Sequence, residues 1–364
     1  MSFLKKKRKT TEKKLSPSPQ STPNPSLPDD LLLSYFARVS RLYYPTLSLV
    51  SKRFQSLLSS VELYKARSHL GNTDICLYVC LEFYPCSQCP TVPPSRPTYV
   101  PGLVAVGSNI YSIEKLSSYV SILDCKSHTW SEAPSLPVKL VSLSASVLDG
   151  KIYVAGCSYK DDDSPDSFEN TLEVFDTKAQ TWDLKTIPCK KRERNIFYFR
   201  ESNIVYSRSA CIDGKFYLKT STEAVSYSSK EDRWDLVGED MCDSMISHYY
   251  CEIENVVYSA SDGILRWYDS EADKWELLKC LEGLPKFPRG SRIRLADYGG
   301  KLVVLWEGDV FDLRHIGGYK KIWCAEIELE RWKRREIWGK VVWFDIVLTI
   351  PKSCYLAKVL AVTV

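Results

Sequence analysis

The chain has 364 residues, of which 44% are hydrophobic and 12% aromatic, and its formal net charge is +4. Its 10 Trp and 22 Tyr residues argue against a disordered chain and favour aromatic-rich sheet packing. Seven Lys and Arg residues against one Glu give the first fourteen residues a charge of +6, which leaves about −2 for the rest. A general nucleic-acid-binding body, which would carry its positive charge on a folded face, is therefore excluded.

Thirteen cysteines are scattered from Cys76 to Cys354. Because the number is odd and no apolar segment with a cleavage site precedes them, we expect reduced thiols rather than a disulfide framework. Apolar runs such as 341–350 are much shorter than the roughly 20 residues that span a bilayer. The sequence predicts a soluble protein of the nucleus, the cytoplasm or both.

Residues 1–25 combine a basic cluster with many Ser and Pro residues. Such a composition buries too little apolar surface to offset chain entropy, so a disordered tail is predicted. The basic run 5–9 resembles a nuclear import signal, but a merely solvating charge run has the same composition. Both readings stay open.

A small helical domain is predicted over residues 26–70. Pro28, Asp29 and Asp30 are typical of a helix start, because proline needs no N–H partner there and acidic residues favour the positive end of the helix dipole. An apolar stripe with spacings of three and four residues predicts a second helix that carries Leu47, Val50, Phe54, Leu57 and Val61. Two or three short helices are expected to fill residues 27–67.

An all-β domain is predicted over residues 75–364, where short Val-, Tyr- and Ile-rich runs alternate with turn residues. Five tryptophans follow each other at intervals of 52, 52, 41 and 57 residues: Trp130, Trp182, Trp234, Trp275 and Trp332. Six residues before each Trp stands a polar residue that can begin a turn: Asp124, Asp176, Ser228, Asp269 and Glu326. A repeat near 50 residues predicts propeller blades, which the tryptophans would pack one on the next.

Each repeat unit also contains an earlier hairpin. Its turn pairs are Gly107-Ser108, Asp149-Gly150, Asp213-Gly214, Glu254-Asn255 and Gly299-Gly300, several of which suit tight primed turns. Four residues after the first member of each pair comes a residue expected to point inward: Tyr111, Tyr153, Tyr217, Tyr258 and Val303. Two hairpins per unit predict five four-stranded blades.

The two ends of this domain hold further strands, at 75–84, 341–350 and 355–364. Joined, these strands would make a composite blade and would hide the edges of an open array. We therefore expect a propeller of six blades, five from clear repeats and one that closes the ring.

The segments 26–33, 37–41, 43–54 and 62–64, followed by these repeats, resemble the plant-type F-box/kelch-repeat proteins over residues 26–364. The kelch double glycine is reduced to Ala155-Gly156-Cys157, so irregular blades are expected. The resemblance implies a substrate-recognition subunit of an SCF-type ubiquitin ligase, with the F-box bound to the Skp-type adaptor and, through it, to the cullin. The contact set that it implies is Leu27, Pro28, Asp29, Leu31, Leu32, Leu47, Val50, Ser51 and Phe54; the alternative is that some of these pack the helical domain itself.

No catalytic site, metal site or cofactor is predicted. The four histidines, His69, His128, His248 and His315, fall in different units. Cys76 and Cys80 with Cys86 and Cys89 offer a weaker zinc alternative, and residues 161–163 a weaker cation alternative to a solvated loop. A kelch-fold enzyme or specifier protein, or an F-box protein that acts outside degradation, remains the alternative function. Neither a membrane nor a nucleic acid is an expected partner.

The target protein is expected on the face that carries the long loops, because loops after second strands and between blades share one side of a propeller. Two of these loops are basic, with Lys190, Lys191, Arg192 and Arg194 in one and Lys286, Arg289, Arg292 and Arg294 in the other. Neighbouring loops are acidic, so a target of mixed or acidic character is expected. A solvated rim without a role is the alternative.

Overall fold

The computed structural model describes residues 27–83, 100–159, 168–187, 208–219, 224–237, 250–261, 263–272, 274–308, 318–332 and 336–364. The chain divides into two compact units, Met1–Asn72 and Thr73–Val364. The predicted basic tail, the cation alternative at 161–163 and Cys86 with Cys89 lie outside the described residues. Among the helices of the described ranges, none has the length and apolar character needed to cross a membrane.

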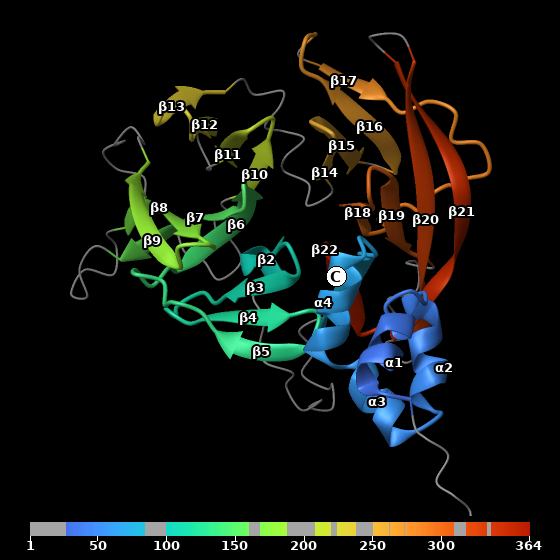
Figure 1. The fold of residues 1–364 in the computed structure, drawn as a ribbon. Coiled ribbons are helices and arrows are strands. Elements are labelled where there is room, and N and C mark those ends of the chain that lie inside the picture. The colour runs from blue at the N-terminus through green and yellow to red at the C-terminus, as the bar shows by residue number, and fades with distance from the viewer. Residues whose placement is uncertain are drawn as a thin grey trace, which may run out of the picture. The chain divides into compact units, whose positions relative to one another are not determined.

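The described part of the first unit is helical (Figure 1). Its elements are α1 (Asp29–Phe36), the 3-10 turn η1 (Arg41–Tyr43), α2 (Tyr44–Ser48), α3 (Lys52–Leu58) and α4 (Val61–His69). The single second helix predicted from the apolar stripe was wrong, because two serines start new helices within it. The Ser51 hydroxyl accepts the Phe54 N–H at 3.1 Å, and the Ser60 hydroxyl accepts the Leu63 N–H at 3.4 Å.

The helices share a small core centred on Leu32, Phe36, Tyr44, Leu58 and Leu63. A buried arginine on α4, Arg67, fastens it: its guanidinium donates to the Val39 carbonyl at 2.8 Å and to the Tyr44 hydroxyl at 3.0 Å. The Tyr44 hydroxyl in turn donates to the Phe36 carbonyl at 2.7 Å. Burial raises the pKa of Tyr44, so this network holds a neutral phenol.

The second unit is a β-propeller with five four-stranded antiparallel blades among its described residues (Figure 1). The short 3-10 turn η2 (Val100–Gly102) precedes the first. Blade 1 holds β2 (Leu103–Val106), β3 (Asn109–Ile113), β4 (Val120–Asp124) and β5 (Thr129–Glu132), and blade 2 holds β6 (Ser142–Leu148), β7 (Lys151–Tyr159), β8 (Phe168–Asp176) and β9 (Thr181–Thr186). Blade 3 holds β10 (Arg208–Ile212), β11 (Lys215–Lys219), β12 (Ala224–Ser228) and β13 (Arg233–Leu236). Blade 4 holds β14 (Tyr250–Ile253), β15 (Val256–Ser261), β16 (Ile264–Asp269) and β17 (Lys274–Leu277), and blade 5 holds β18 (Ile293–Asp297), β19 (Leu302–Glu307), β20 (Tyr319–Trp332) and β21 (Glu336–Pro351).

The turn chemistry of the blades agrees with the sequence. Both central residues of the first hairpin turn have positive φ in blade 2, 51° at Asp149 and 73° at Gly150, as a type I′ turn requires. In the second hairpin turn the Asp176 carboxylate accepts the N–H groups of Lys178 and Ala179, at 2.9 and 3.0 Å. The equivalent carboxylates of Asp124 and Asp269 also accept backbone N–H groups of their own turns. Each carboxylate therefore fixes the start of its turn, as predicted.

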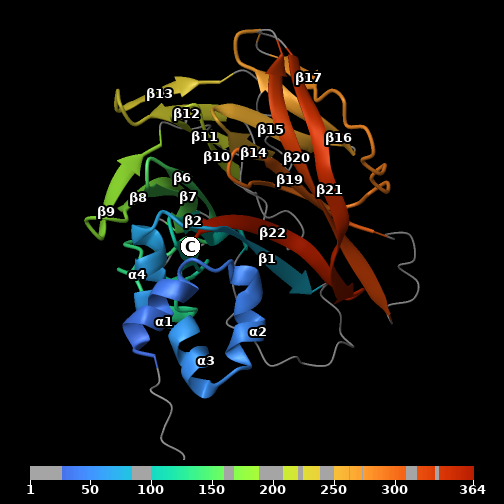
Figure 2. The same ribbon diagram turned by 45° about the vertical axis from the view of Figure 1, so that its right-hand side comes forward.

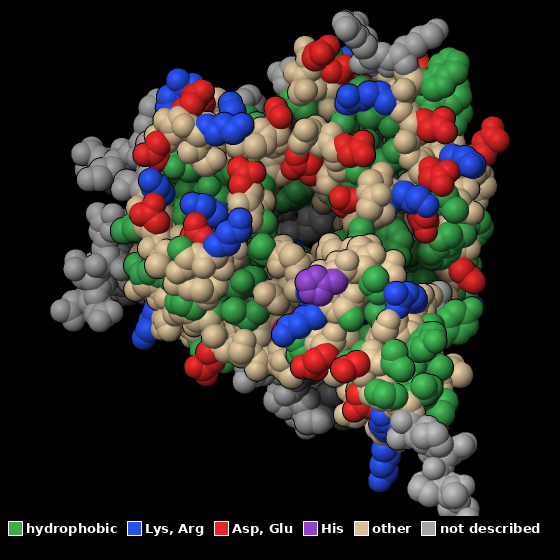
Figure 3. Space-filling model, viewed as in Figure 1, with side chains coloured by type: hydrophobic (Ala, Val, Ile, Leu, Met, Phe, Trp, Pro, Cys, Tyr) green, Lys and Arg blue, Asp and Glu red, His purple; other side chains and the backbone are tan. Residues whose placement is uncertain are grey.

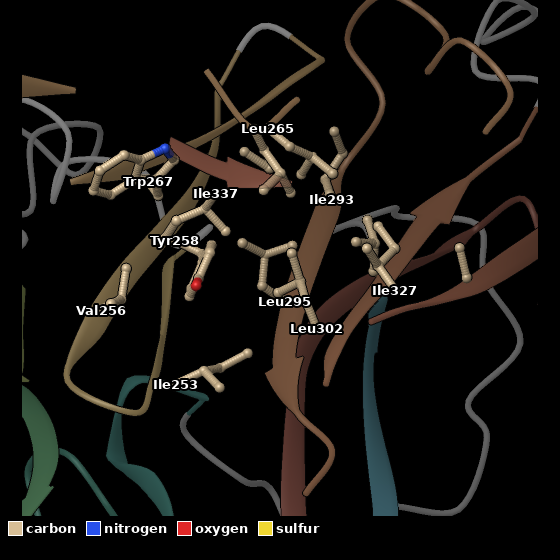
Figure 4. Close-up of a cluster of buried hydrophobic side chains, with 14 of the residues drawn as sticks. Ile253, Val256, Tyr258, Leu265, Trp267, Ile293, Leu295, Leu302, Ile327 and Ile337 are labelled. Atoms are coloured by element: carbon tan, nitrogen blue, oxygen red, sulfur yellow. The ribbon is translucent and has the colours of Figure 1, made fainter. Parts of the chain in front are cut away.

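Neighbouring blades pack through large apolar side chains. The cluster in Figure 4 joins Tyr258, Leu265 and Trp267 of blade 4 to Leu295, Leu302 and Ile327 of blade 5. The predicted inward positions agree: Tyr111, Tyr153, Tyr258 and Val303 are buried, and Tyr217 is half-buried. The core of the propeller is thus a set of interfaces rather than one centre.

The prediction of six blades was wrong. The two ends of the propeller do pair, but only as a two-stranded sheet of β1 (Ile75–Phe83) and β22 (Cys354–Thr363), which lie side by side in Figure 2. Residues 341–350, expected in the closing blade, belong instead to β21, the last strand of blade 5. This closing sheet packs on blade 5 and reaches blade 1 through Thr363, whose N–H donates to the Gly107 carbonyl at 3.2 Å.

The fifth repeat is also displaced from its predicted alignment. Trp332 ends the third strand, β20, whereas the other four repeat tryptophans lie on fourth strands. In blade 2 Tyr153 pairs with Val174, and the turn-start residue Asp176 comes two residues later. In blade 5 the equivalent residue Val303 pairs with Glu326, so Glu328 and not Glu326 corresponds to the turn start. The position equivalent to the repeat tryptophan is Val341, the partner of Ile327.

Candidate docking surfaces

The helical unit leaves several large apolar side chains in solvent. Leu27 is 52% exposed and Leu31 47%, and Tyr35, which follows at the same spacing of four on α1, is 63% exposed. At the α2–α3 junction Leu49 and Val50 are 85% and 64% exposed. Large apolar side chains that gather on one surface mark a place that a partner covers.

An arginine ties the two exposed segments together. The Arg53 guanidinium, at the start of α3, donates to the Asp29 carboxylate at 2.8 Å and to the Leu27 carbonyl at 2.6 Å. This contact fixes the beginning of α1 beside the residues that follow α2. Leu27, Leu31 and the exposed pair Leu49 and Val50 therefore border one surface.

The structure separates the predicted adaptor-contact residues into two groups. Leu27, Pro28, Asp29, Leu31, Val50 and Ser51 are exposed. Leu32 is buried in the helical core, with Leu47 and Phe54 partly buried against it, and the Phe54 ring meets the Phe36 ring edge-on at 4.9 Å. These three residues belong to the core of the helical unit, and the exposed residues of the predicted contact set are held in place by that core.

Sequence reasoning missed Tyr35, Tyr43 and Leu49 on this unit. Tyr43 is 62% exposed at the end of η1. The spacing of Tyr35 from Leu31 could have identified Tyr35. No sequence pattern could have identified Leu49, because its exposure depends on α2 ending at the residue before it, Ser48.

The basic loop before blade 5 only partly matches its prediction. Lys286 and Arg289 are exposed, as a binding surface needs. Arg292 is half-buried and stacks over the Tyr355 ring, with 3.8 Å between its guanidinium carbon and the ring centroid. Arg294 is 7% exposed and donates to the Ala357 carbonyl of β22 at 2.6 Å, so it fastens the closing sheet and does not project from the loop. The other predicted basic group, Lys190, Lys191, Arg192 and Arg194, lies outside the described residues.

The propeller presents a second charged region that the sequence did not reveal. Figure 3 shows acidic side chains around the central opening of the propeller. At the ends of first strands and in the turns that follow them stand Asp149, Asp213, Glu252, Glu254 and Asp297. Burial raises the pKa of Glu252, whose carboxylate accepts the Asp213 N–H at 3.3 Å. The residues are far apart in sequence, and only the ring brings them together.

Comparison with known proteins covers both units. Residues 25–66 match the family model of the F-box domain, and residues 80–348 match that of the FKB95 kelch-repeats domain. F-box/kelch-repeat protein At5g51250 of Arabidopsis thaliana is 49% identical, covering 92% of this chain and 98% of its own. Putative F-box/kelch-repeat protein At5g38680 of the same plant is 45% identical over 98% of this chain and 100% of its own. The solved structure of YjhT covers 60% of this chain and 75% of its own with a TM-score of 0.39 and 12% identity, too slight a likeness to support a conclusion.

Proposed function

This chain belongs to the F-box/kelch-repeat protein family, and from that premise we propose that it is the substrate-recognition subunit of an SCF-type ubiquitin ligase. The helical unit binds the Skp-type adaptor, and the adaptor brings in the cullin scaffold. The propeller holds the target protein. The chain itself is non-catalytic in this proposal and acts by raising the concentration of the target near a ubiquitin-charged enzyme.

The observation that carries the proposal is the exposed apolar surface of the helical unit. Leu27, Leu31, Leu49 and Val50 are between 47% and 85% exposed although the unit has a complete core of its own. The apolar area that these side chains leave in water contributes nothing to folding, but it contributes about 25 cal/mol per Å² when a partner buries it. A groove on the adaptor that receives these side chains accounts for their exposure.

Charged loops are the proposed target contacts on the propeller. Lys286 and Arg289 project from the loop before β18 and, with the basic group at 190–194, suit a target of mixed or acidic character. Rim charges of this kind act mainly on the association rate. Reversing Lys286 and Arg289 to Glu is expected to slow target capture most at low salt, where screening is weakest.

Adaptor docking is tested by pull-down of a purified Skp-type adaptor with the full-length chain. Replacing Leu27 and Pro28 with Ala is expected to lower adaptor binding at least tenfold, because both lie on the proposed surface. Leu70→Ala is the matched control, since Leu70 is 43% exposed at the end of α4 and does not belong to the predicted contact set. Equal binding by the double variant and the control would refute docking through this surface.

A further inference from the structure

The closing sheet makes the ring uneven at one position, the seam between blade 5 and the paired ends of the propeller. Every blade has four strands, whereas the closing sheet has two among the described residues. β22 lies beside the first strands of blade 5 and blade 1, and β1 pairs with it. Among the described residues, the sheet therefore supplies the counterparts of two blade strands and none for the outer two.

Outer strands supply aromatic side chains to three of the other interfaces. Each of blades 2, 3 and 4 contributes an aromatic pair from its third and fourth strands to the cluster it shares with the preceding blade. The ring centroids of the pairs lie 4.8, 5.1 and 5.2 Å apart: Phe175 and Trp182, Tyr227 and Trp234, Tyr268 and Trp275. These rings cover the face of the blade before them. In the part of the chain that the structure describes, blade 5 receives no such pair from the closing sheet.

A groove of about 450 Å³ lies where the rings would be. The closing sheet forms one wall with Ile75, Leu77 and Val79 of β1. Blade 5 forms the other wall, with Val303 of β19, Cys324 and Glu326 of β20, and Trp343, Val347 and Leu348 of β21 among its lining residues. Most of these side chains are apolar, so the groove suits an apolar occupant.

The apolar surface continues along the rim. On β21 the side chains of Trp343, Val347 and Leu348 are 41%, 42% and 37% exposed. Glu326, on the floor, is already satisfied, because its carboxylate accepts from Lys301 Nζ at 2.6 Å and from Trp343 Nε1 at 2.8 Å. Desolvation of Glu326 therefore does not oppose the entry of an apolar group.

We propose that this groove binds an extended segment of a partner protein, which places aromatic or large aliphatic side chains where the outer strands of a sixth blade would place them. An extended chain fits because strands fill the corresponding space at the other interfaces. Its alternate side chains point to one face, so two successive apolar residues of that face enter the groove together. This docking site goes beyond the proposed adaptor function and does not depend on it.

An exposed carboxylate beside the groove indicates which charge the bound segment should carry. Asp345 pairs with Cys324 across β20 and β21, so its side chain lies on the face of β21 that borders the groove. Its carboxylate accepts the Ile346 N–H at 2.7 Å and is otherwise exposed. A Lys or Arg residue of the segment can pair with it. The preferred segment thus combines alternating large apolar residues with one cation.

The test is selection of a phage-displayed library of random linear dodecapeptides against the full-length chain, followed by fluorescence polarisation with the enriched peptides. Val347→Glu is expected to weaken binding at least tenfold, because it puts a charge on the rim. Val342→Glu is the matched control: Val342 also lies at a bulge of β21, is 44% exposed and does not line the groove. The control is expected to bind within twofold of the wild type.

The proposal would be overturned by no enrichment over the bare support, by enriched peptides without alternating large apolar residues, or by binding that Val347→Glu leaves unchanged. Self-association of the chain in sedimentation equilibrium that Val347→Glu abolishes would show a second copy as the occupant and would also overturn it. Asp345→Asn is expected to weaken only the peptides that contain Lys or Arg. If Val347→Glu fails to fold, a benzophenone-labelled peptide replaces it, and cross-links outside β1, β20 and β21 would contradict the site.

Discussion

The interface between blades 2 and 3 and the seam at the closing sheet hold the ring together by different means. Between the blades, the Tyr153 and Phe216 rings stack at 5.4 Å within a cluster of buried apolar side chains. At the seam, charged side chains hold the backbone of β22. The Glu307 carboxylate accepts the Leu356 N–H at 2.7 Å and pairs with Lys320 at 2.8 Å, while Arg294 donates to the Ala357 carbonyl.

The other side of β22 follows the same pattern, since Lys358 Nζ donates to the Leu103 carbonyl of blade 1 at 2.5 Å. A two-stranded sheet offers less apolar side-chain area for packing than a four-stranded blade. Hydrogen bonds between charged side chains and the backbone therefore replace part of the apolar packing at the seam. The exposure of Trp130 agrees: it is 40% exposed on blade 1, next to the closing sheet, whereas its counterparts Trp182, Trp234 and Trp275 are half-buried. The comparison teaches that the seam depends on a few specific groups.

Removing β22 is expected to have the largest effect. A chain that ends at Pro351 loses the strand that joins blade 5 to blade 1 and exposes the edges of both. We expect little soluble protein and rapid proteolysis. A chain that begins at Thr73 is the control, because the helical unit is separate, and it should melt like the full propeller. A soluble truncated protein with an unchanged melting curve would show that the five blades close without the seam.

Breaking the buried ion pair between Glu307 and Lys320 at the seam is expected to have the second-largest effect on stability. Glu307→Ala removes the carboxylate that pairs with Lys320 and accepts the Leu356 N–H, at sites that are 6% exposed or less, and is expected to cost about 4–5 kcal/mol in the free energy of unfolding. Glu276→Ala removes the exposed pair with Lys274 and should cost less than about 1 kcal/mol. Urea unfolding measures both. Similar values for the two variants would contradict the role given to the seam charges.

Emptying the apolar interface is expected to cost slightly less. Phe216 is fully buried between blades 2 and 3, and Phe216→Ala should lower the free energy of unfolding by about 3–4 kcal/mol through lost burial and a cavity. Phe216→Leu keeps most of the volume and should cost less than about half of that. Equal losses in the two variants, measured by urea unfolding, would speak against packing as the cause.

In the described part of the chain, blade 2 contains a buried carboxyl without the charged partner that the buried Glu307 has at the seam. Glu173 is fully buried, and neither oxygen has a hydrogen-bond partner among the described residues, so burial raises its pKa. The folded state then holds a proton that the unfolded state releases, and stability falls as the pH rises above the unfolded pKa of about 4.3. Glu173→Met should therefore stabilise the chain by about 1–2 kcal/mol at pH 7.5, and this gain should shrink toward pH 4. A gain that does not vary with pH would rule out the carboxyl as its source.

Much of the fold was readable because turns and repeats depend on local chemistry. Asp149-Gly150 and Asp213-Gly214 predict their turns, since few residue pairs accept positive φ at both positions. The fifth repeat misled because Glu326 and Trp332 reproduce the turn-to-tryptophan spacing by coincidence. The residues between them alternate Ile and Leu with Glu and include no turn former, a pattern of one continuous strand that could have exposed the error.

The candidate sites were less predictable because exposure is a tertiary property. The sequence indicated Leu27, Leu31 and Val50, but only packing shows that Leu32 turns into the helical core. Likewise the sequence of β21 reads as an ordinary apolar strand. Its role in a groove follows from the closing sheet having two described strands where each blade has four, and no local sequence pattern indicates this difference.

The most direct measurement of the proposed function compares two chains purified from plant cells under proteasome block: the wild type and Val50→Asp, which changes an exposed residue of the helical unit. The wild type should retain the Skp-type adaptor, the cullin and a set of further proteins. The variant should lose the adaptor and the cullin and keep the further proteins, because the propeller is unchanged. Retention of the adaptor by the variant, or loss of all partners together, would contradict a chain in which one unit docks on the ligase and the other holds the target.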